Sequence, residues 1–263
     1  MKWWSRDKAA PTLPPSLPAD TELIDKLRWA RVISALPHVH MIPGLDTQDD
    51  VLYIFGLANH VMRTVGKERP PVIVEVGCFA GRLSRGLVAA VVESDAWLYL
   101  VDTFQSLDSR DADATKVEPW ATFRRCQEVS GLAFGQLLSF QLHQEQLTRE
   151  RTQIVHARGW ESTGKGWDAI VGQSHEPRID LLVLSTFLTY QELLDSSNGW
   201  LRWLRPGGLV QFMDAGSNKD FAGIAREVVQ TKRWGVVGAR QSAGRSGLLL
   251  QRPLDDTSGG TRR

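Results

Sequence analysis

The sequence of 263 residues predicts an α/β fold: a Rossmann-like, doubly wound, mostly parallel sheet with an antiparallel last strand. Short β-branched runs, which suit buried parallel strands, alternate with segments of helical periodicity. A glycine turn directly follows the first of these runs, as at the ligand-binding edge of open α/β sheets. The chain also ends in two short strands around a turn, which predicts a hairpin and hence the antiparallel strand.

The most informative segment is 72–84, which reads Val-Ile-Val-Glu-Val-Gly-Cys-Phe-Ala-Gly-Arg-Leu-Ser. Gly77 lets the turn approach a ligand without a Cβ in the way, and Gly81 precedes a predicted helix start. This spacing is neither Gly-x-Gly-x-x-Gly nor that of a P-loop. We expect backbone N–H groups to surround a ligand here. The Glu75 carboxylate can accept hydrogen bonds from a cationic or hydroxylated group.

The second predicted strand is 97–102, Trp-Leu-Tyr-Leu-Val-Asp, which again ends in an acid. Apolar residues between the two strands repeat at helical spacing and predict a packed crossover helix: Leu83, Leu87, Val88 and Val91. An acid roughly 20 or more residues beyond such a turn, at the second strand end, is placed to bind ribose hydroxyls. Asp102 is therefore a candidate ribose ligand. The alternative is a helix or turn cap.

Composition limits the classes of partner and compartment. The 31 basic and 30 acidic residues form no long basic stripe, so nucleic acid is not an expected partner. No apolar run approaches the length of a membrane span, and no membrane association is expected. Cys78 and Cys126 give neither metal spacing nor a disulfide framework. They fit a reducing compartment, so we expect a cytoplasmic protein.

The two ends of the chain are expected to be flexible. Residues 1–20 form a proline-rich leader that cannot be regular helix, and 254–263 are expected to be a disordered tail. Trp3 and Trp4 lie in the leader. They could dock on a partner subunit, which would give a homodimer through the N-terminal segment. A simply disordered end is the alternative.

A single domain is expected over 21–253. It begins with two helices within residues 21–66, at 21–36 and 47–66, which would cover the sheet or the active site. Thr47 is a plausible N-cap for the second helix, because Asp49 and Asp50 follow in its first turn.

The second half continues the alternation. The polar segment 105–118 lacks periodicity and is expected to be a lid loop. Pro206-Gly207-Gly208 predicts a turn that feeds an apolar strand. Further strands are expected over 153–156, 179–185, 235–239 and 247–251. Further helices are expected around 120–129, over 190–201 and over 220–231.

Three stretches together resemble the class I S-adenosylmethionine (SAM) methyltransferases. They are Glu-Val-Gly-Cys-Phe-Ala-Gly at 75–81, Val-Asp-Thr-Phe at 101–104 and Leu-Arg-Pro-Gly-Gly-Leu-Val-Gln-Phe-Met-Asp at 204–214. They look most like the branch of macrolide-sugar O-methyltransferases of the macrocin and mycinamicin type, over roughly 50–251. The resemblance implies the class I methyltransferase fold, with SAM across the carboxyl ends of the strands.

The resemblance also implies roles for individual residues. The residues implied for cofactor binding are Glu75, Gly77, Cys78, Gly81, Ser84, Asp102, Thr103 and Phe104. The glycine turn would hold the methionine portion of SAM, and Phe104 would contact the adenine or the acceptor. Asp214 would bind the acceptor or assist the base. His156, which follows a predicted strand, is a candidate base, and Tyr190 is a further catalytic candidate.

One departure from that branch concerns a metal. Its members commonly carry Asp-Gly-x-His-x-Tyr after the adenine loop, and the acid helps to bind a divalent ion. Here Ser185 and Leu188 stand in place of the acid and the histidine, whereas Tyr190 and Asp214 remain. Because a serine hydroxyl is a poor Mg²⁺ ligand, we expect no bound metal.

The expected function is SAM-dependent O-methylation of a small-molecule or sugar-containing metabolite in natural-product or glycan biosynthesis, without a metal. Methyl transfer requires alignment of the reacting atoms and removal of the acceptor proton. The alternative is a catalytically inactive protein of the same fold that binds a ligand or stabilises a partner enzyme. The lost acid and histidine favour it, and the intact Glu75, Gly77, Gly81 and Asp102 oppose it.

Overall fold

The computed structural model describes residues 23–39, 42, 46–78, 81–92, 94–102, 152–156, 179–185, 199–213, 219–242 and 245–254. The helices are α1 (Leu23–Val39), α2 (Gln48–Thr64), α3 (Ser84–Val91) and α9 (Lys219–Lys232). The strands are β1 (Val72–Val76), β2 (Trp97–Asp102), β3 (Thr152–His156), β4 (Ile179–Leu184), β5 (Leu204–Phe212), β6 (Gly235–Ser242) and β7 (Arg245–Gln251).

The strands form one seven-stranded sheet in the order β3-β2-β1-β4-β5-β7-β6. Neighbours from β3 to β5 are parallel, and β7 is antiparallel to both β5 and β6. The predicted parallel sheet with an antiparallel last strand is therefore confirmed. The strand order changes direction between β1 and β4, and open α/β sheets bind ligands at the carboxyl edge of such a switch point.

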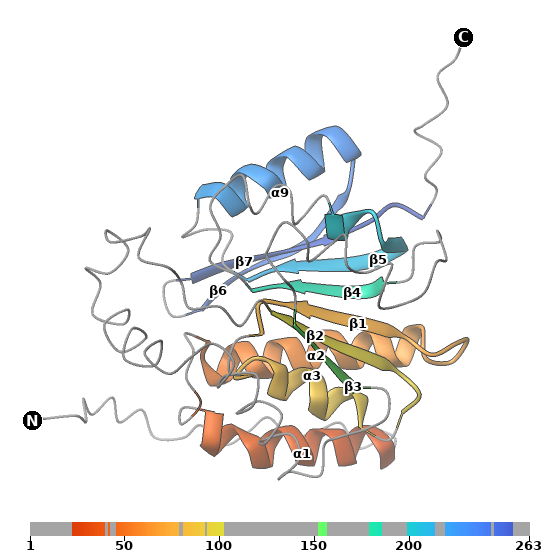
Figure 1. The fold of residues 1–263 in the computed structure, drawn as a ribbon, viewed down its shortest axis with the longest axis vertical. Helices are drawn as coiled ribbons and strands as arrows, with labels where there is room; N and C mark the ends of the chain where they lie inside the picture. The colour runs from red at the N-terminus through yellow and green to blue at the C-terminus, as the bar shows by residue number, and fades with distance from the viewer. Residues whose placement is uncertain are drawn as a thin grey trace, which may run out of the picture.

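Helices cover both faces of the sheet. Helices α1, α2 and α3 lie on one face and α9 on the other (Figure 1). Alternate residues of β1 enter different apolar clusters: Ile73 packs toward α2 and α3, whereas Val74 packs with Trp200 and Val228. This burial on both faces explains why β1, β2 and β4 are mostly apolar. No helix in the described part of the chain has the length and hydropathy needed to cross a membrane.

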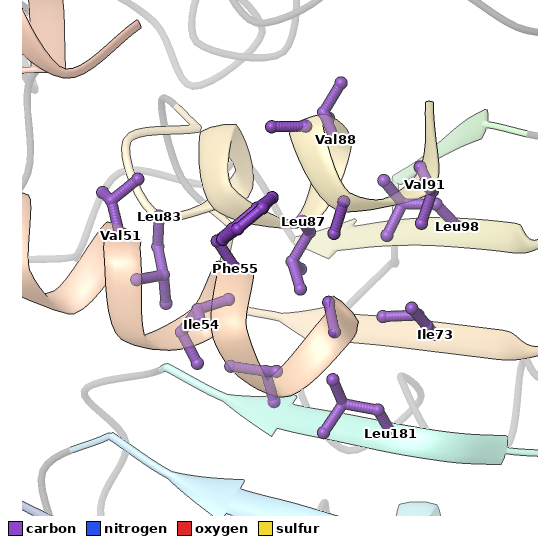
Figure 2. Packing of buried hydrophobic residues seen from close by; sticks show 14 of the residues in the cluster. Val51, Ile54, Phe55, Ile73, Leu83, Leu87, Val88, Val91, Leu98 and Leu181 are labelled. Carbon is purple, nitrogen blue, oxygen red and sulfur yellow. The ribbon is translucent and has the colours of Figure 1, made fainter. Parts of the chain in front are cut away.

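Helices α2 and α3 approach each other closely at Gly86. A Cβ at this position would lie 2.3 Å from the Val51 carbonyl oxygen and 3.0 Å from the Phe55 nitrogen. Side chains around this contact, including Leu83 and Leu87, pack between the helices and the sheet (Figure 2). The absence of a Cβ at Gly86 therefore allows α3 to pack directly against the amino-terminal half of α2.

The predicted N-cap of α2 is confirmed. The Asp50 N–H donates to the Thr47 hydroxyl, and the Thr47 N–H donates to the Asp50 carboxylate at 2.7 Å, which forms a capping box. Helix α1 continues to Val39 through Pro37, three residues beyond its expected end.

The predicted Pro-Gly-Gly turn is wrong in its placement. Residues 206–208 lie inside β5, where the register with β4 shifts between the pairs Ile179–Leu204 and Leu181–Leu209. The extra residues of β5 form an irregularity in the ladder rather than a connection before it. The predicted leader, the loop at 105–118 and the tail beyond residue 254 lie outside the described residues.

Candidate functional site

The glycine turn follows β1 at the switch point of the sheet. Gly77 has a φ of +90° and Gly81 a φ of +83°, which residues with a Cβ rarely adopt. The Gly77 N–H donates to the Val101 carbonyl at 2.8 Å, and the Gly81 N–H donates to the Cys78 carbonyl at 2.8 Å. These bonds fix a tight passage from β1 toward α3.

Glu75 carries the most unusual group of the site. Its side chain is fully buried, at 0% exposure. The Ser84 hydroxyl, at the start of α3, donates to Glu75 Oε2 at 2.6 Å. No group among the described residues hydrogen-bonds to Glu75 Oε1. Because a buried carboxylate oxygen without a partner is costly, a ligand that donates a hydrogen bond there would be stabilised.

Burial and the charges around Glu75 determine its protonation state. Burial raises the pKa of Glu75 to about 8, against the lowering effect of the Ser84 hydrogen bond. The negative charges of Asp46 and Asp102 contribute to this rise. Glu75 therefore holds a proton at neutral pH, and a cationic ligand would favour its ionised form.

Asp102 and Cys78 complete the wall beside the turn. Asp102 ends β2 and is 6% exposed; it directly follows Val101, the partner of Val76. Burial and the charges of Asp102 and Glu75 hold the pKa of the Cys78 thiol well above its usual value, so the thiol stays neutral. A buried carboxylate at the second strand end is the arrangement that ribose binding requires, and this role stays a prediction.

Ser185 occupies the strand end where the resembling branch has an acid. Its N–H donates to the Val76 carbonyl at 2.9 Å, and its hydroxyl donates to the Gly77 carbonyl at 3.3 Å. The serine thus ties β4 to the glycine turn. Among the described residues, no group of three or more His, Cys, Asp and Glu side chains is arranged to hold a metal ion. Asp214 and residues 186–190 lie outside that part of the chain, so the metal prediction is untested.

The segment before α2 reaches the same edge, which the sequence did not predict. Arg82, directly after Gly81, donates from Nε to the Ile42 carbonyl at 2.6 Å and from Nη1 to the Asp46 carbonyl at 2.9 Å. Asp46 lies near enough for its charge to raise the pKa of Glu75. No local pattern around Asp46 announces this contact, because it depends on Arg82 from the turn.

A second polar cluster links α2 to the far side of the site. The Tyr53 hydroxyl donates to Gln211 Oε1 at 2.9 Å, and Gln211 Nε2 donates to the Phe212 carbonyl at 2.8 Å. The Arg240 guanidinium lies 4.6 Å from the centre of the Tyr53 ring and 3.1 Å from Asp50 Oδ1. These contacts fix the end of β5 against α2 and β6.

The structure therefore gathers part of the predicted site at one edge. The predicted cofactor residues found there are Glu75, Gly77, Cys78, Gly81, Ser84 and Asp102. His156 ends β3 and its backbone is paired with Asp102, at the same edge. Thr103, Phe104, Tyr190 and Asp214 lie outside the described residues, so their roles stay predictions.

Comparison with known proteins supports the fold. No family model and no curated protein matches the sequence. Among solved structures, the O-methyltransferase NovP has a TM-score of 0.57 and 15% identity, over 88% of this chain and 99% of that chain. An O-methyltransferase from Bacillus cereus in complex with S-adenosylhomocysteine (SAH) has a TM-score of 0.52 and 12% identity, over 87% and 90%.

A calicheamicin methyltransferase is similar to the same extent, with a TM-score of 0.51 and 15% identity, over 88% of this chain and 93% of that chain. At these identities the likeness concerns the fold. Together with the strand order and the antiparallel β7, it shows that the chain has the fold of these O-methyltransferases, as the resemblance implied.

Proposed function

We propose that this protein is a SAM-dependent methyltransferase that methylates a hydroxyl of a small-molecule or sugar-containing acceptor. The observation that carries the proposal is Glu75 Oε1, which is buried beside the glycine turn without a hydrogen-bond partner among the described residues. SAM brings a positively charged methionine portion to such an oxygen. Its ribose hydroxyls match the Asp102 carboxylate at the neighbouring strand end. The solved structures of the same fold are O-methyltransferases.

Each residue has a defined task under this proposal. Bound SAM supplies a methyl group activated by a sulfonium. Glu75, Gly77 and Gly81 hold the methionine portion, and the Ser84 hydroxyl orients the Glu75 carboxylate. Asp214 binds the acceptor or assists removal of its proton.

The remaining catalytic assignments are also proposals. His156 serves as the base at the edge that its strand shares with Asp102, and Tyr190 assists at the acceptor. Thr103 and Phe104 follow Asp102 and contact the cofactor. Positioning and proton removal together account for transfer to a hydroxyl.

We infer that the transfer needs no metal. The hydroxyl of Ser185 donates to the Gly77 carbonyl, which gives it a local role at the position of the branch's metal-binding acid. We also infer a cytoplasmic location from the two cysteines and their spacing. A homodimer through the N-terminal segment is a further proposal, which rests on Trp3 and Trp4.

Calorimetric titration with SAM and with SAH tests the proposal. Asp102→Ala should weaken binding roughly ten- to hundred-fold, because charged hydrogen bonds contribute about 1.5–3 kcal/mol. Asp95→Ala is the matched control, since it removes an exposed acid just before the other end of β2. Absence of heat and of a thermal shift with both forms of the cofactor would refute the proposal.

Turnover separates an active enzyme from an inactive relative. SAH formation would be followed with a panel of sugar-bearing acceptors, in EDTA and then with Mg²⁺ added. Activity that survives EDTA agrees with a side-chain base. Activity that is lost in EDTA and restored by Mg²⁺ would show that Asp214 shares an ion. Binding of SAM without any transfer would favour the inactive alternative.

A further inference from the structure

A buried amide interrupts the apolar face that β5 turns toward α2. Leu209 and Met213 belong to the apolar cluster around α2 and α3, whereas Gln211 between them is polar and 1% exposed. Side chains two residues apart share one face of a strand, so the amide is placed among apolar neighbours. A buried amide costs free energy unless both of its ends are hydrogen-bonded, so its contacts indicate its role.

Both ends of the Gln211 amide are bound. The Tyr53 hydroxyl of α2 donates to Gln211 Oε1 at 2.9 Å, and Gln211 Nε2 donates to the Phe212 carbonyl at 2.8 Å. Burial raises the pKa of the Tyr53 phenol against the opposing charge of Arg240, so the hydroxyl keeps its proton and can donate. Because Tyr53 binds the amide oxygen, the amide nitrogen is directed at the backbone of β5.

The neighbouring strand leaves space for this amide. A Cβ at Gly247 of β7 would lie 2.7 Å from Gln211 Nε2 and 3.1 Å from the Phe212 carbonyl oxygen. Gly247 directly precedes Leu248, which pairs with Phe212 at the end of the antiparallel β5–β7 ladder. The amide therefore lies over the backbone of β7 where the pairing of the two strands ends, and a larger residue at position 247 would displace it.

These contacts hold one peptide unit at the carboxyl end of β5. The Phe212 carbonyl accepts from Gln211, and the Met213 N–H of the same peptide donates to the Leu184 carbonyl at 3.0 Å. Because both polar groups are bound, the orientation of this peptide is fixed, and with it the direction in which the chain leaves β5. Open α/β sheets bind ligands at this edge, and β5 lies on the other side of the switch point from Glu75.

We propose that Gln211 is a positioning residue for methyl transfer: it holds the carboxyl end of β5 so that Asp214, the residue after Met213, meets the acceptor. Tyr53 has the same role one step further away, because it orients the amide. This inference rests on the proposed function, which assigns the acceptor to Asp214. Gln211 acts through the backbone and does not contact SAM, so its loss should slow transfer and leave cofactor binding unchanged.

The test compares Gln211→Met with Gln251→Met. The exposed Gln251 side chain of β7 donates to the Gly207 carbonyl of β5 at 3.0 Å, toward the amino end of the same strand pair. Methionine keeps the length of each side chain and removes the amide. With an acceptor identified by the turnover panel, we expect kcat to fall roughly ten- to hundred-fold in Gln211→Met, while the affinity for SAM stays unchanged. Gln251→Met should change neither quantity.

Two further variants separate positioning from a general loss of stability. Tyr53→Phe keeps the ring and removes only the hydroxyl, so kcat should fall by a smaller factor, again without a change in SAM affinity. In an Asp214→Asn background, Gln211→Met should cause no further loss, because both changes affect the same step. Hydrogen exchange at the Met213 amide should become faster in Gln211→Met and stay unchanged in Gln251→Met.

The outcomes distinguish this inference from the function on which it rests. A wild type that binds no SAM would overturn the proposed function, and one that binds SAM without any transfer would overturn the role in transfer. An active wild type, with kcat unchanged in Gln211→Met and Tyr53→Phe, would overturn only the positioning role. A parallel fall in SAM affinity, or an equal loss in the Asp214→Asn background, would do the same. Should Gln211→Met fail to fold, Tyr53→Phe decides between these outcomes.

Discussion

Two buried carboxylates at opposite edges of the sheet are treated very differently. Asp180, at the amino end of β4, is 3% exposed and accepts from both terminal nitrogens of Arg69 and, at 2.8 Å, from the Val72 N–H. Arg205 Nε lies 3.7 Å from Asp180 Oδ1. Glu75, at the carboxyl end of β1, accepts one hydrogen bond from Ser84, and its Oε1 has no partner among the described residues.

We interpret this difference as one of role: the contacts of Asp180 stabilise the fold, whereas Glu75 is suited to bind a ligand. At the amino edge each charge is compensated within the chain, and the bond to Asp180 is the largest cause that raises the pKa of Arg69. At the carboxyl edge, Glu75 Oε1 has no hydrogen-bond partner among the described residues. A buried carboxylate stays ionised only where partners compensate its charge. Glu75 Oε1 has no such partner among the described residues, so the group must bind either a proton or a ligand.

The largest expected effect is at the compensated edge. Asp180→Ala leaves Arg69 and the Val72 N–H without their carboxylate, and loss of one partner from such a buried network typically costs about 3–5 kcal/mol. We expect about 3 kcal/mol here, since Arg69 is partly exposed. Urea unfolding followed by circular dichroism measures it. Asp49→Asn, which removes an exposed acid from the first turn of α2, should stay within about 1 kcal/mol. A cost below about 1 kcal/mol for Asp180→Ala would mean that this network does not hold β1 to β4.

The next effect has the opposite sign and appears at Glu75. The unfolded chain loses the Glu75 proton near its ordinary pKa of 4.5, whereas the folded protein keeps it up to a pKa of about 8. The folded state binds more protons between these values, so the free energy of unfolding falls as pH rises through this window and stays low above it. Below the lower value both states are protonated and the contribution vanishes.

Glu75→Gln should remove this loss. In the absence of ligand the variant should exceed the wild type in stability at pH 8, by at most a few kcal/mol, and approach it near pH 4. It should also lose most of its affinity for SAM. Chemical unfolding across this pH range measures the difference. Identical pH profiles for the two proteins would show that Glu75 is ionised in the folded state and that the contrast with Asp180 is mistaken.

A smaller effect is expected where α2 meets α3. Gly86→Ala would place a methyl 2.3 Å from the Val51 carbonyl oxygen, and overpacking of this kind costs about 1–3 kcal/mol. Gly56→Ala, on the exposed side of α2 with nothing within 4 Å, should instead stabilise the protein by up to about 1 kcal/mol. Since Gly86 lies two residues after Ser84, which donates to Glu75, Gly86→Ala should also weaken SAM binding. Thermal unfolding and titration of both variants test this, and equal effects would contradict it.

The parts that sequence reasoning predicted have local causes. The β-branched run before Gly77 and the acid that ends β2 identify a strand–turn–helix–strand unit wherever they occur. Thr47 with Asp50 three residues later predicts a capping box from a fixed spacing. These signals depend on neighbours in the chain and need no knowledge of the fold.

The parts that it missed depend on distant contacts. The segment before α2 comes to the glycine turn because Arg82 binds the carbonyls of Ile42 and Asp46. Asp180 meets Arg69 only once β1 and β4 pair. The composition of the Pro-Gly-Gly segment predicts a turn. The pairing of Leu204 with Ile179 draws it into β5 instead. Strand pairing, rather than local composition, thus determines that residues 206–208 belong to β5.

The smallest effect concerns the single hydrogen bond that Glu75 does have. The Ser84 hydroxyl donates to Oε2 at 2.6 Å and lowers the pKa of Glu75. Ser84→Ala should raise this pKa further, so that SAM must displace a more tightly held proton and binds up to about ten-fold more weakly at pH 7. Stability should fall by about 1 kcal/mol, because the buried Glu75 carboxyl loses its hydrogen bond, and the preference of alanine for helix offsets part of this loss. Ser34→Ala, which removes an exposed hydroxyl from α1, is the control.

Titration of Ser84→Ala with SAM at pH 7 and at pH 9 shows whether Ser84 acts through Glu75. The deficit should shrink at the higher pH, where less of the carboxyl is protonated, whereas a deficit equal at both would mean that Ser84 contacts SAM directly and does not act through Glu75.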